Sequence, residues 1–237
     1  MKQILVILLG VFVTVQMNAQ YLNHQLRFEP VWSRVADALG EPGSVESAEF
    51  SVDGKYIVSG TKFDNSVIMW RTSDGAELWR KYAAEEVERV GFSADGKYVA
   101  AASEDYLVTV YEAKSGETVK LLKHQRGIDG LTWSHNANIL VTGEERIELD
   151  DDQTEGWIRI FQFPEGDEIK SLNFGNTVNE LFFSSDDKYL MAVGHGNVKV
   201  YETENWSLVQ TLNPGYFVTF TSGMFSPDYK YVVAVGQ

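Results

Sequence analysis

One seven-residue stretch recurs five times along the chain, at intervals of about forty residues. The first two copies read Phe-Ser-x-Asp-Gly-Lys-Tyr, and the later copies keep the opening aromatic-Ser pair. The five copies are Phe50–Tyr56, Phe92–Tyr98, Trp133–Ile139, Phe183–Tyr189 and Phe225–Tyr231, with spacings of 42, 41, 50 and 42 residues. A fixed period of this length is typical of proteins built from stacked structural repeats.

Each copy is flanked by apolar runs, which predict strands on both sides of a hairpin turn. Asp-Gly suits such a turn, because glycine accepts a positive φ and aspartate bonds its own backbone. A third, alternating run such as Val67–Trp70 follows, and then a short fourth run such as Glu77–Trp79. We expect the aromatics that end the first and third strands to be core residues. Four strands per repeat predict an all-β propeller of four-stranded antiparallel blades, with about four and a half repeats present.

The repeat divides the chain into a leader, a lead-in and an array of blades. We expect a signal peptide at 1–19, an N-terminal lead-in at 20–44 and the propeller at 45–237. The blades are expected near 45–82, 85–124, 127–174, 176–213 and, in part, 217–237. Four and a half blades predict either an incomplete piece of a longer propeller or a five-bladed ring closed by residues 21–32. Within the lead-in, Val31, Val35 and Leu39 fit a helical turn, whereas Gln25–Glu29 fits a strand that pairs with the last blade.

The Phe-Ser-x-Asp-Gly-Lys turn and the aromatic that ends each third strand resemble the WD-repeat propellers over residues 45–237. The Trp-Asp dipeptide of that family falls on Trp70-Arg71, Tyr111-Glu112, Phe161-Gln162 and Tyr201-Glu202, so the match is partial. The resemblance implies a buried polar network, which the chain matches in part at Ser59, Asp64 and Trp70, and at His124 and Thr142. Packing is expected to replace this network in most blades. Lactonase-like and surface-layer propellers of bacteria show similar departures from the WD-repeat pattern, so these families remain alternatives.

The first nineteen residues indicate export. Lys2 precedes an apolar run from Ile4 to Val15, and Ala19 precedes the expected cleavage before Gln20. We therefore expect a periplasmic or extracellular protein that is not inserted in a membrane after cleavage. The alternative is an uncleaved anchor, although the run is shorter than the ~20 residues of a membrane span.

The charge balance narrows the classes of partner. The chain has 34 acidic and 20 basic residues, for a formal net charge of −14, and no cysteine. This charge disfavours nucleic acid and favours proteins, glycans or cations. Thiolate chemistry and cysteine metal sites are excluded. The histidines (His24, His124, His135 and His195) form no paired metal-ligand spacing, and we expect no catalytic residue, metal or cofactor.

Two departures from the repeat are candidate partner-binding sites. The third repeat carries an acidic insertion, and Trp206 stands in the fourth repeat where other blades place glycine at a turn. The candidate residues are Glu144, Glu145, Asp150, Asp151, Asp152, Glu155 and Trp206. The insertion is read as a partner-binding loop, a calcium site or a solvated acidic loop, since calcium takes six to eight oxygen ligands.

The resemblance implies a non-enzymatic scaffold that binds a protein partner through its loop faces, and the first nineteen residues indicate that this scaffold is exported. The alternative is a lactonase-like hydrolase, or the propeller part of a larger exported enzyme. Polar residues lining the central channel distinguish the two, since converging histidines and carboxylates favour the enzyme.

Overall fold

The computed structural model describes residues 33, 36, 45–149, 154–213 and 218–236, and the described chain is built from β-strands and turns. In chain order the strands are β1 (Val45–Phe50), β2 (Tyr56–Thr61), β3 (Ser66–Arg71), β4 (Glu77–Tyr82), β5 (Val87–Phe92), β6 (Tyr98–Ser103), β7 (Leu107–Glu112), β8 (Thr118–Lys123), β9 (Ile128–Trp133), β10 (Ile139–Glu144), β11 (Ile147–Glu148), β12 (Thr154–Glu155), β13 (Trp157–Gln162), β14 (Asp167–Asn173), β15 (Val178–Phe183), β16 (Tyr189–Gly194), β17 (Val198–Glu202), β18 (Ser207–Leu212), β19 (Phe220–Phe225) and β20 (Val232–Gly236).

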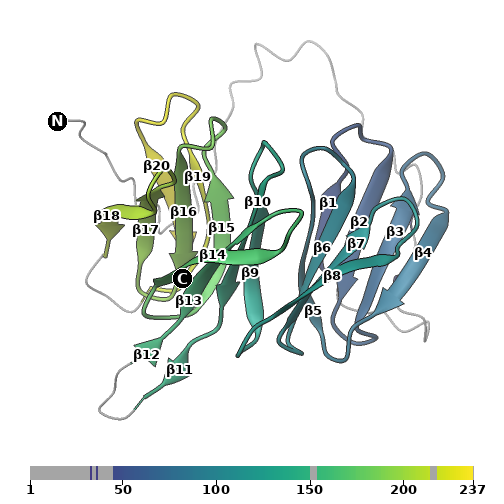
Figure 1. Ribbon diagram of the computed structural model, residues 1–237, viewed down its shortest axis with the longest axis horizontal. Helices are drawn as coiled ribbons and strands as arrows, with labels where there is room; N and C mark the ends of the chain where they lie inside the picture. The colour runs from purple at the N-terminus through teal and green to yellow at the C-terminus, as the bar shows by residue number, and fades with distance from the viewer. Residues whose placement is uncertain (1–32, 34–35, 37–44, 150–153, 214–217, 237) are drawn as a thin grey trace, which may run out of the picture.

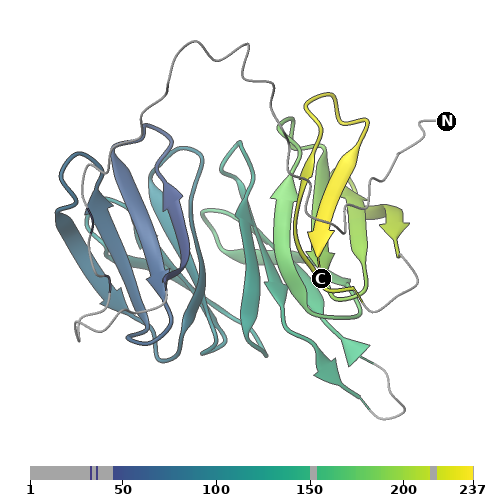
Figure 2. The same ribbon diagram turned by 180° about the vertical axis from the view of Figure 1, so that it is seen from behind.

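These strands form four antiparallel four-stranded sheets and one two-stranded sheet, which follow one another across the molecule (Figures 1 and 2). We name them blades 1 to 5: β1–β4, β5–β8, β9 with β10, β13 and β14, β15–β18, and β19–β20. The small β11–β12 ribbon extends from blade 3. The expected propeller architecture, with four complete blades and part of a fifth, is confirmed. Residues 1–19, and nearly all of the lead-in, lie outside the described residues.

The same hairpin joins the first two strands of every blade. In blade 1 the Ser51 hydroxyl donates to Asp53 Oδ1 at 2.8 Å and accepts from the Tyr56 N–H at 3.0 Å. The equivalent pairs of bonds recur in the other four hairpins. The left-handed position is Gly54 in blade 1 and Gly96 in blade 2. The recurring motif is therefore the hairpin that the sequence predicts.

Neighbouring blades pack through their first and second strands. β1 lies against β5, β5 against β9, β9 against β15 and β15 against β19. Glycine in the second strand allows this approach, because a Cβ at Gly143 would lie 2.5 Å from Val178 Cγ1. The third-strand aromatics Trp70, Tyr111, Phe161 and Tyr201 are buried as expected.

The first-strand aromatics differ from the expectation in blade 1. Phe92 and Trp133 are buried, but Phe50 is 60% exposed. The reason is that β1 has no preceding blade against it among the described strands, and Figures 1 and 2 show blades 1 and 5 at opposite ends of the row. The expectation that Phe50 is a core residue was wrong.

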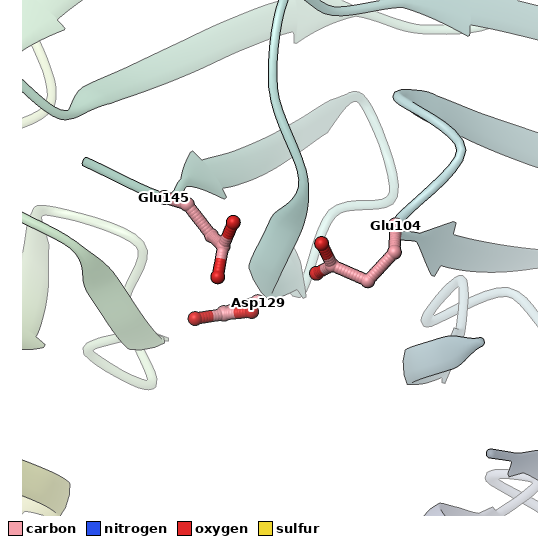
Figure 3. Close-up of side chains that lie close together, drawn as sticks. All are labelled: Glu104, Asp129 and Glu145. Atoms are coloured by element: carbon pink, nitrogen blue, oxygen red, sulfur yellow. The ribbon is translucent and has the colours of Figure 1, made fainter. Parts of the chain in front are cut away.

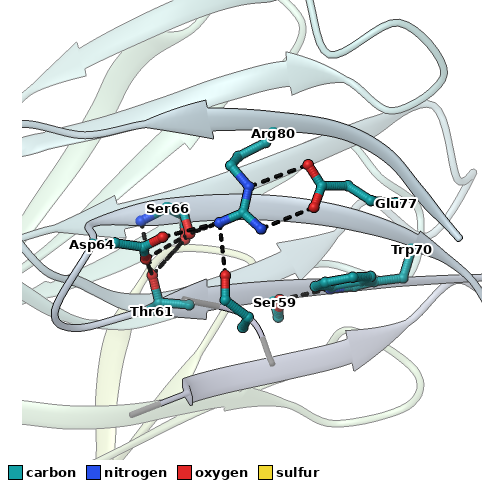
Figure 4. Close-up of polar contacts among 8 residues, drawn as sticks. Ser59, Thr61, Asp64, Ser66, Trp70, Glu77 and Arg80 are labelled. Carbon is teal, nitrogen blue, oxygen red and sulfur yellow. Dashed lines mark hydrogen bonds and ion pairs between the residues drawn. The ribbon is translucent and has the colours of Figure 1, made fainter. Parts of the chain in front are cut away.

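The polar network of blade 1 is only partly the one expected. Trp70 Nε1 donates to Ser59 Oγ at 2.9 Å, as the resemblance implies. Asp64 instead forms an ion pair with Arg80, with 2.9 Å between Asp64 Oδ2 and Arg80 Nη1 (Figure 4). Arg80 also forms an ion pair with Glu77 at 2.9 Å. Between blades 2 and 3, Nε2 of His124, the residue after β8, lies 2.8 Å from Oγ1 of Thr142 in β10. Burial lowers the pKa of His124 to about 4, so this histidine is a neutral structural bridge at pH 7.

None of the described residues belongs to a helix long and apolar enough to span a bilayer.

Candidate binding site at the propeller axis

Polar side chains converge where the first strands of successive blades meet. The second residue of the first strand is Glu88 in β5, Asp129 in β9, Asn179 in β15 and Thr221 in β19. Because these strands pack in sequence around a common axis, their equivalent side chains line one cavity of 320 Å³. Its lining is completed by Glu86, Arg89, Glu104 and Glu145. We call this cavity the axial mouth.

Three carboxylates form the centre of the axial mouth. Glu104 follows β6, Asp129 lies within β9 and Glu145 follows β10. One carboxylate oxygen of each lies within 4.8 Å of the other two, and Figure 3 shows the three side chains turned toward one another. Gly127 leaves space for this arrangement, since a Cβ there would lie 2.2 Å from Glu104 Oε2. The site therefore joins blade 2 to blade 3.

Partial burial and mutual repulsion make these carboxylates hard to ionise. Burial, followed by the charge of Glu145, raises the pKa of Glu104 to about 8. Burial first and Glu145 second raise the pKa of Asp129 to about 6. Burial and the charge of Asp129 raise the pKa of Glu88 to about 7. Perturbed groups gathered in one cavity are a recognised mark of a functional site.

The cations around the axial mouth are largely committed to other groups. Arg89 donates to the backbone carbonyls of Asp129 at 3.3 Å and Asn179 at 3.1 Å. Lys62 pairs with Glu86 at 2.6 Å. Within the described parts of the chain, no lysine or arginine forms an ion pair with Glu104, Asp129 or Glu145. These carboxylates can accept an incoming cationic group, hold protons or supply oxygen ligands to a hard cation.

The residues of the acidic insertion in blade 3 differ in burial, and Glu144 lies in the protein interior. Glu144 is fully buried and pairs with Arg159 at 2.6 Å, so it is not the exposed loop residue that the sequence predicts. Its position at the end of β10 turns it into the protein, whereas the adjacent Glu145 faces the axial mouth. Glu155 pairs with Arg126 at 3.6 Å. Asp150, Asp151 and Asp152 lie outside the described residues.

Trp206 occupies the turn between β17 and β18. Its φ of 59° is the left-handed conformation that Gly75 and Gly116 adopt in the equivalent turns of blades 1 and 2. The side chain is half-buried and packs against the core between blades 3 and 4. Only part of the indole is thus available to a partner. Trp206 is not among the residues that line the axial mouth.

Sequence reasoning identified Glu145 but missed Glu88, Glu104 and Asp129. Each of the missed residues, taken alone, is an ordinary surface acid on a strand or turn. Alignment of the repeats does contain a signal for these residues. The second residue of the first strand is acidic in three successive repeats, at Glu46, Glu88 and Asp129. The residue after the second strand is acidic in two successive repeats, at Glu104 and Glu145.

Two family models match the chain. The "Anaphase-promoting complex subunit 4 WD40 domain" model matches residues 61–136, and the "WD domain, G-beta repeat" model matches residues 36–71. Together the two matches cover residues 36–136, which include both Asp-Gly-Lys turns of the chain, at 53–55 and 95–97.

Curated relatives match a larger share of the chain at low identity. The serine-threonine kinase receptor-associated protein of Bos taurus is 22% identical over 201 residues, which are 84% of this chain and 54% of that protein. THO complex subunit 3 of Arabidopsis thaliana is 29% identical over 46% of this chain and 35% of that protein. Echinoderm microtubule-associated protein-like 2 of Homo sapiens is 27% identical over 51% of this chain and 19% of that protein. The chain therefore spans about half the length of the first of these relatives, and less of the others.

Proposed function

Because the chain belongs to the WD-repeat β-propeller family, we propose that it is a non-enzymatic scaffold that binds a protein partner through the axial mouth. The family membership supports a protein-interaction role in general. By name, the relatives are a serine-threonine kinase receptor-associated protein, a subunit of the THO complex and an echinoderm microtubule-associated protein-like protein. The geometry of the axial mouth supports this cavity as the place where the partner binds.

The observation that carries the proposal is the group of acidic side chains without paired cations at the axial mouth. Glu104, Asp129 and Glu145 lie together in a cavity that opens to solvent. A lysine or arginine of a partner would relieve their repulsion and form charge-assisted hydrogen bonds. We therefore propose that the partner presents a basic segment.

Titration with a basic synthetic peptide tests this proposal. The probe is a Lys- and Arg-containing peptide, measured by calorimetry at low and moderate salt against an acidic peptide of the same length. The double variant Glu104→Gln/Glu145→Gln should weaken binding by about tenfold or more, as for loss of a close charge pair at an interface. Affinity for the wild-type chain should also fall as salt rises.

The matched control neutralises two exposed acids of outer turns, Glu117→Gln/Glu165→Gln. The two double variants carry the same net charge above pH 8, where Glu104 is ionised, so the comparison is made there. The control should retain the wild-type affinity. Equal weakening in both double variants would mean that the peptide responds only to the net charge of −14, and the axial site would be abandoned.

We propose further that the chain is exported, on the strength of the basic residue and apolar run in residues 1–19. Intact-mass measurement of the protein recovered outside the cytoplasm should give a chain that begins at Gln20. Recovery of only the full-length chain, in the cytoplasm, would contradict this. Recovery of the full-length chain in the membrane fraction would favour the uncleaved anchor.

The second candidate is a hydrolase, and one observation favours it: carboxylates with raised pKa values converge at the axis. Oxygen ligands of this kind also suit calcium. Calcium-dependent hydrolysis of simple lactones, abolished by Asp129→Asn, would support the enzyme over the scaffold. A separate calcium titration of the triple variant Asp150→Asn/Asp151→Asn/Asp152→Asn tests the insertion, and heats equal to those of the wild type would exclude a calcium site there.

A further inference from the structure

A second cavity lies toward the opposite end of the first strands from the axial mouth. The axial mouth uses the second residue of these strands, whereas this cavity uses the fifth residues of β1, β5 and β9, which are Glu49, Gly91 and Thr132. Because a strand rises by about 3.3 Å per residue, the two levels are about 10 Å apart. The cavity has a volume of 210 Å³ and extends to the hairpins that follow the three strands. We call it the hairpin pocket.

The hairpin pocket forms where blade 2 lacks a side chain that blade 1 has. In blade 1, Oε1 of Glu49 accepts a hydrogen bond from the backbone N–H of Phe92 in blade 2 at 3.0 Å. Gly91 holds the place of Glu49 in blade 2, so nothing reaches Trp133 of blade 3 in the same way. A Cβ at Gly91 would lie 3.4 Å from Glu49 Oε2 and 3.7 Å from Trp133 Cδ1. The space beside Gly91 is therefore bounded by a carboxylate oxygen and the edge of an indole ring.

Trp133 brings a buried hydrogen-bond donor to this space. The residue is 8% exposed, and within the described part of the chain its Nε1 has no hydrogen-bond partner. Nε1 is bonded to Cδ1, the ring atom that lies nearest Gly91. The ring also packs against Phe163, with centroids 5.0 Å apart and planes at 87°. Trp133 thus offers an N–H edge but no open ring face.

Other indoles of the chain show that this donor is unusual. A buried indole N–H normally has an acceptor, because an unpaired one costs free energy. Three other tryptophans donate from Nε1 to acceptors of the protein, and these are Trp70, Trp79 and Trp157. The unpaired donor of Trp133 therefore points to an acceptor supplied by a ligand.

His135 brings an acceptor, because the next blade determines its tautomer. Nδ1 of His135 lies 2.7 Å from Asp187 Oδ1. The same carboxylate accepts the backbone N–H groups of His135 at 2.9 Å and Asn136 at 3.0 Å. Since the carboxylate is the acceptor, Nδ1 carries the proton, and Nε2 of the neutral ring keeps a lone pair. His135 lines the hairpin pocket, so this lone pair is available to a ligand there.

Glu49 supplies the second acceptor. Its Oε1 is used by the Phe92 N–H, whereas Oε2 lies beside Gly91. Burial of this carboxyl group against blade 2 raises its pKa, and the bond from Phe92 opposes that shift. When ionised, the group only accepts hydrogen bonds. The hairpin pocket thus combines one donor with two acceptors.

We propose that the hairpin pocket binds a primary carboxamide, supplied either by a glutamine or asparagine side chain of a partner or by a small free amide. A carboxamide has one carbonyl oxygen that accepts and an NH₂ group that donates twice, which is the complement of this set. The carbonyl oxygen would accept from Trp133 Nε1. The NH₂ group would donate to Glu49 Oε2 and His135 Nε2.

Other classes of ligand leave part of this set unpaired. A carboxylate has no hydrogen to donate and would be repelled by Glu49 and by the net charge of −14. An ammonium or guanidinium group has no acceptor for the Trp133 N–H. A sugar would need an open aromatic face for stacking, which the buried Trp133 lacks. The carboxamide is the group that satisfies all three protein atoms.

The test follows the indole N–H resonance of Trp133 in two-dimensional ¹⁵N NMR spectra of the full chain above neutral pH. The resonance is identified by its loss in Trp133→Phe. Propionamide should shift it saturably. Propionate and propylammonium, which have nearly the same size, should bind about tenfold more weakly or worse, because each lacks half of the donor and acceptor set.

Two tripeptides distinguish the sources of the carboxamide. Gly-Gln-Gly should compete with propionamide, and Gly-Glu-Gly should not. Tighter binding of Gly-Gln-Gly than of propionamide would assign the site to a side chain of a partner. Weaker binding would assign it to a small free amide, and both results support a carboxamide site.

Glu49→Gln should change the specificity of the pocket. The Phe92 N–H holds the new carbonyl oxygen, so the NH₂ group takes the place of Oε2 and donates into the pocket. Propionamide should then bind about tenfold more weakly, and propionate should bind more tightly than it does to the wild type. Glu117→Gln, in an exposed outer turn, is the control and should leave both affinities unchanged.

Gly91→Ala locates the site, because its methyl group would occupy the space between Glu49 Oε2 and the indole edge. It should abolish the response to propionamide in a chain whose thermal unfolding shows that it is folded. If this variant does not fold, the specificity change in Glu49→Gln decides the matter. No saturable shift with propionamide, equal binding of propionamide, propionate and propylammonium, or binding that survives Gly91→Ala would overturn the proposal.

This site is separate from the axial mouth. The axial double variant Glu104→Gln/Glu145→Gln should leave propionamide binding unchanged, and Gly91→Ala should leave the basic peptide bound. The two proposals can therefore fail separately.

Discussion

Five serine side chains determine how the hairpins fold. Each hydroxyl accepts a backbone N–H from across the turn while donating to the aspartate or asparagine two residues later. The aspartate or asparagine in turn accepts the N–H that follows the left-handed residue. These local bonds explain why a seven-residue motif could be recognised as a turn from the sequence.

The left-handed residue of the blade 3 hairpin is Ala137, and its conformation leads to a prediction about stability. Its φ is 59°, whereas the equivalent residues of blades 1 and 2 are glycines. Because alanine is strained there and glycine is not, Ala137→Gly should raise the free energy of unfolding by about 0.5–1 kcal/mol. The reciprocal change Gly96→Ala should lower it by a similar amount. Urea unfolding curves measure both, and a destabilised Ala137→Gly would show that the strain is absent.

The axial carboxylates predict that stability falls as pH rises. The pKa of Glu104 is raised from 4.5 to about 8 in the folded chain, so the folded state binds more protons than the unfolded state. Its contribution is fully present below pH 4.5 and is lost as pH rises through 8. Glu88 and Asp129 act in the same direction, with pKa values of about 7 and 6.

Glu104→Gln should therefore flatten the dependence of the urea midpoint on pH between pH 5 and 9. The exposed substitution Glu117→Gln serves as the control and should keep the slope of the wild type. A Glu104→Gln variant with an unchanged slope would show that the axial carboxylates ionise independently of folding.

At the scale of the strand, small residues fix the spacing between blades. A Cβ on Gly143 would meet Val178 Cγ1 at 2.5 Å and the Val178 carbonyl oxygen at 3.1 Å. Gly143→Ala should therefore cost about 1–3 kcal/mol by overpacking. Val178→Ala in the same chain should recover part of this loss, because it removes the methyl groups that clash. Thermal and urea unfolding of the two variants provide the measurement, and full additivity of their effects would contradict the contact.

The strands could be predicted from the sequence because each depends on neighbours within about forty residues. The alternating third-strand runs became β3, β7, β13 and β17, and their closing aromatics are buried. The exposure of Phe50 could not be predicted in this way, since burial of a first strand depends on the blade before it. The pairing of Asp64 with Arg80 was equally hidden, because a neighbouring strand supplies the guanidinium.

At the scale of the whole molecule, the site exists only because successive blades place equivalent residues around one axis. Glu104 and Glu145 are 41 residues apart in sequence, yet one carboxylate oxygen of Glu104 lies within 4.8 Å of one carboxylate oxygen of Glu145. The acidic insertion drew attention in the sequence because it breaks the repeat. The axial residues keep the repeat, so in the sequence they differ from ordinary surface acids only in forming a column of acids at equivalent positions of successive repeats.

The same scale explains why the two ends of the row differ from the middle. Blades 2, 3 and 4 have a neighbour on each side, whereas β1 and β20 do not among the described strands. The first strand of blade 1 accordingly exposes Phe50, whereas Phe92 and Trp133, at the equivalent positions of blades 2 and 3, are buried. The axial mouth lies between these ends, on blades 2 to 5.

Hydrogen exchange of the chain with and without the basic peptide tests the central claim most directly. If the axial mouth binds the partner segment, protection should appear at 86–89, 127–130 and 144–146, where the axial acids and their backbone lie. The outer turns around Gly75 and Gly116 should be unaffected. Protection confined to those outer turns, with none at the axial segments, would contradict the account.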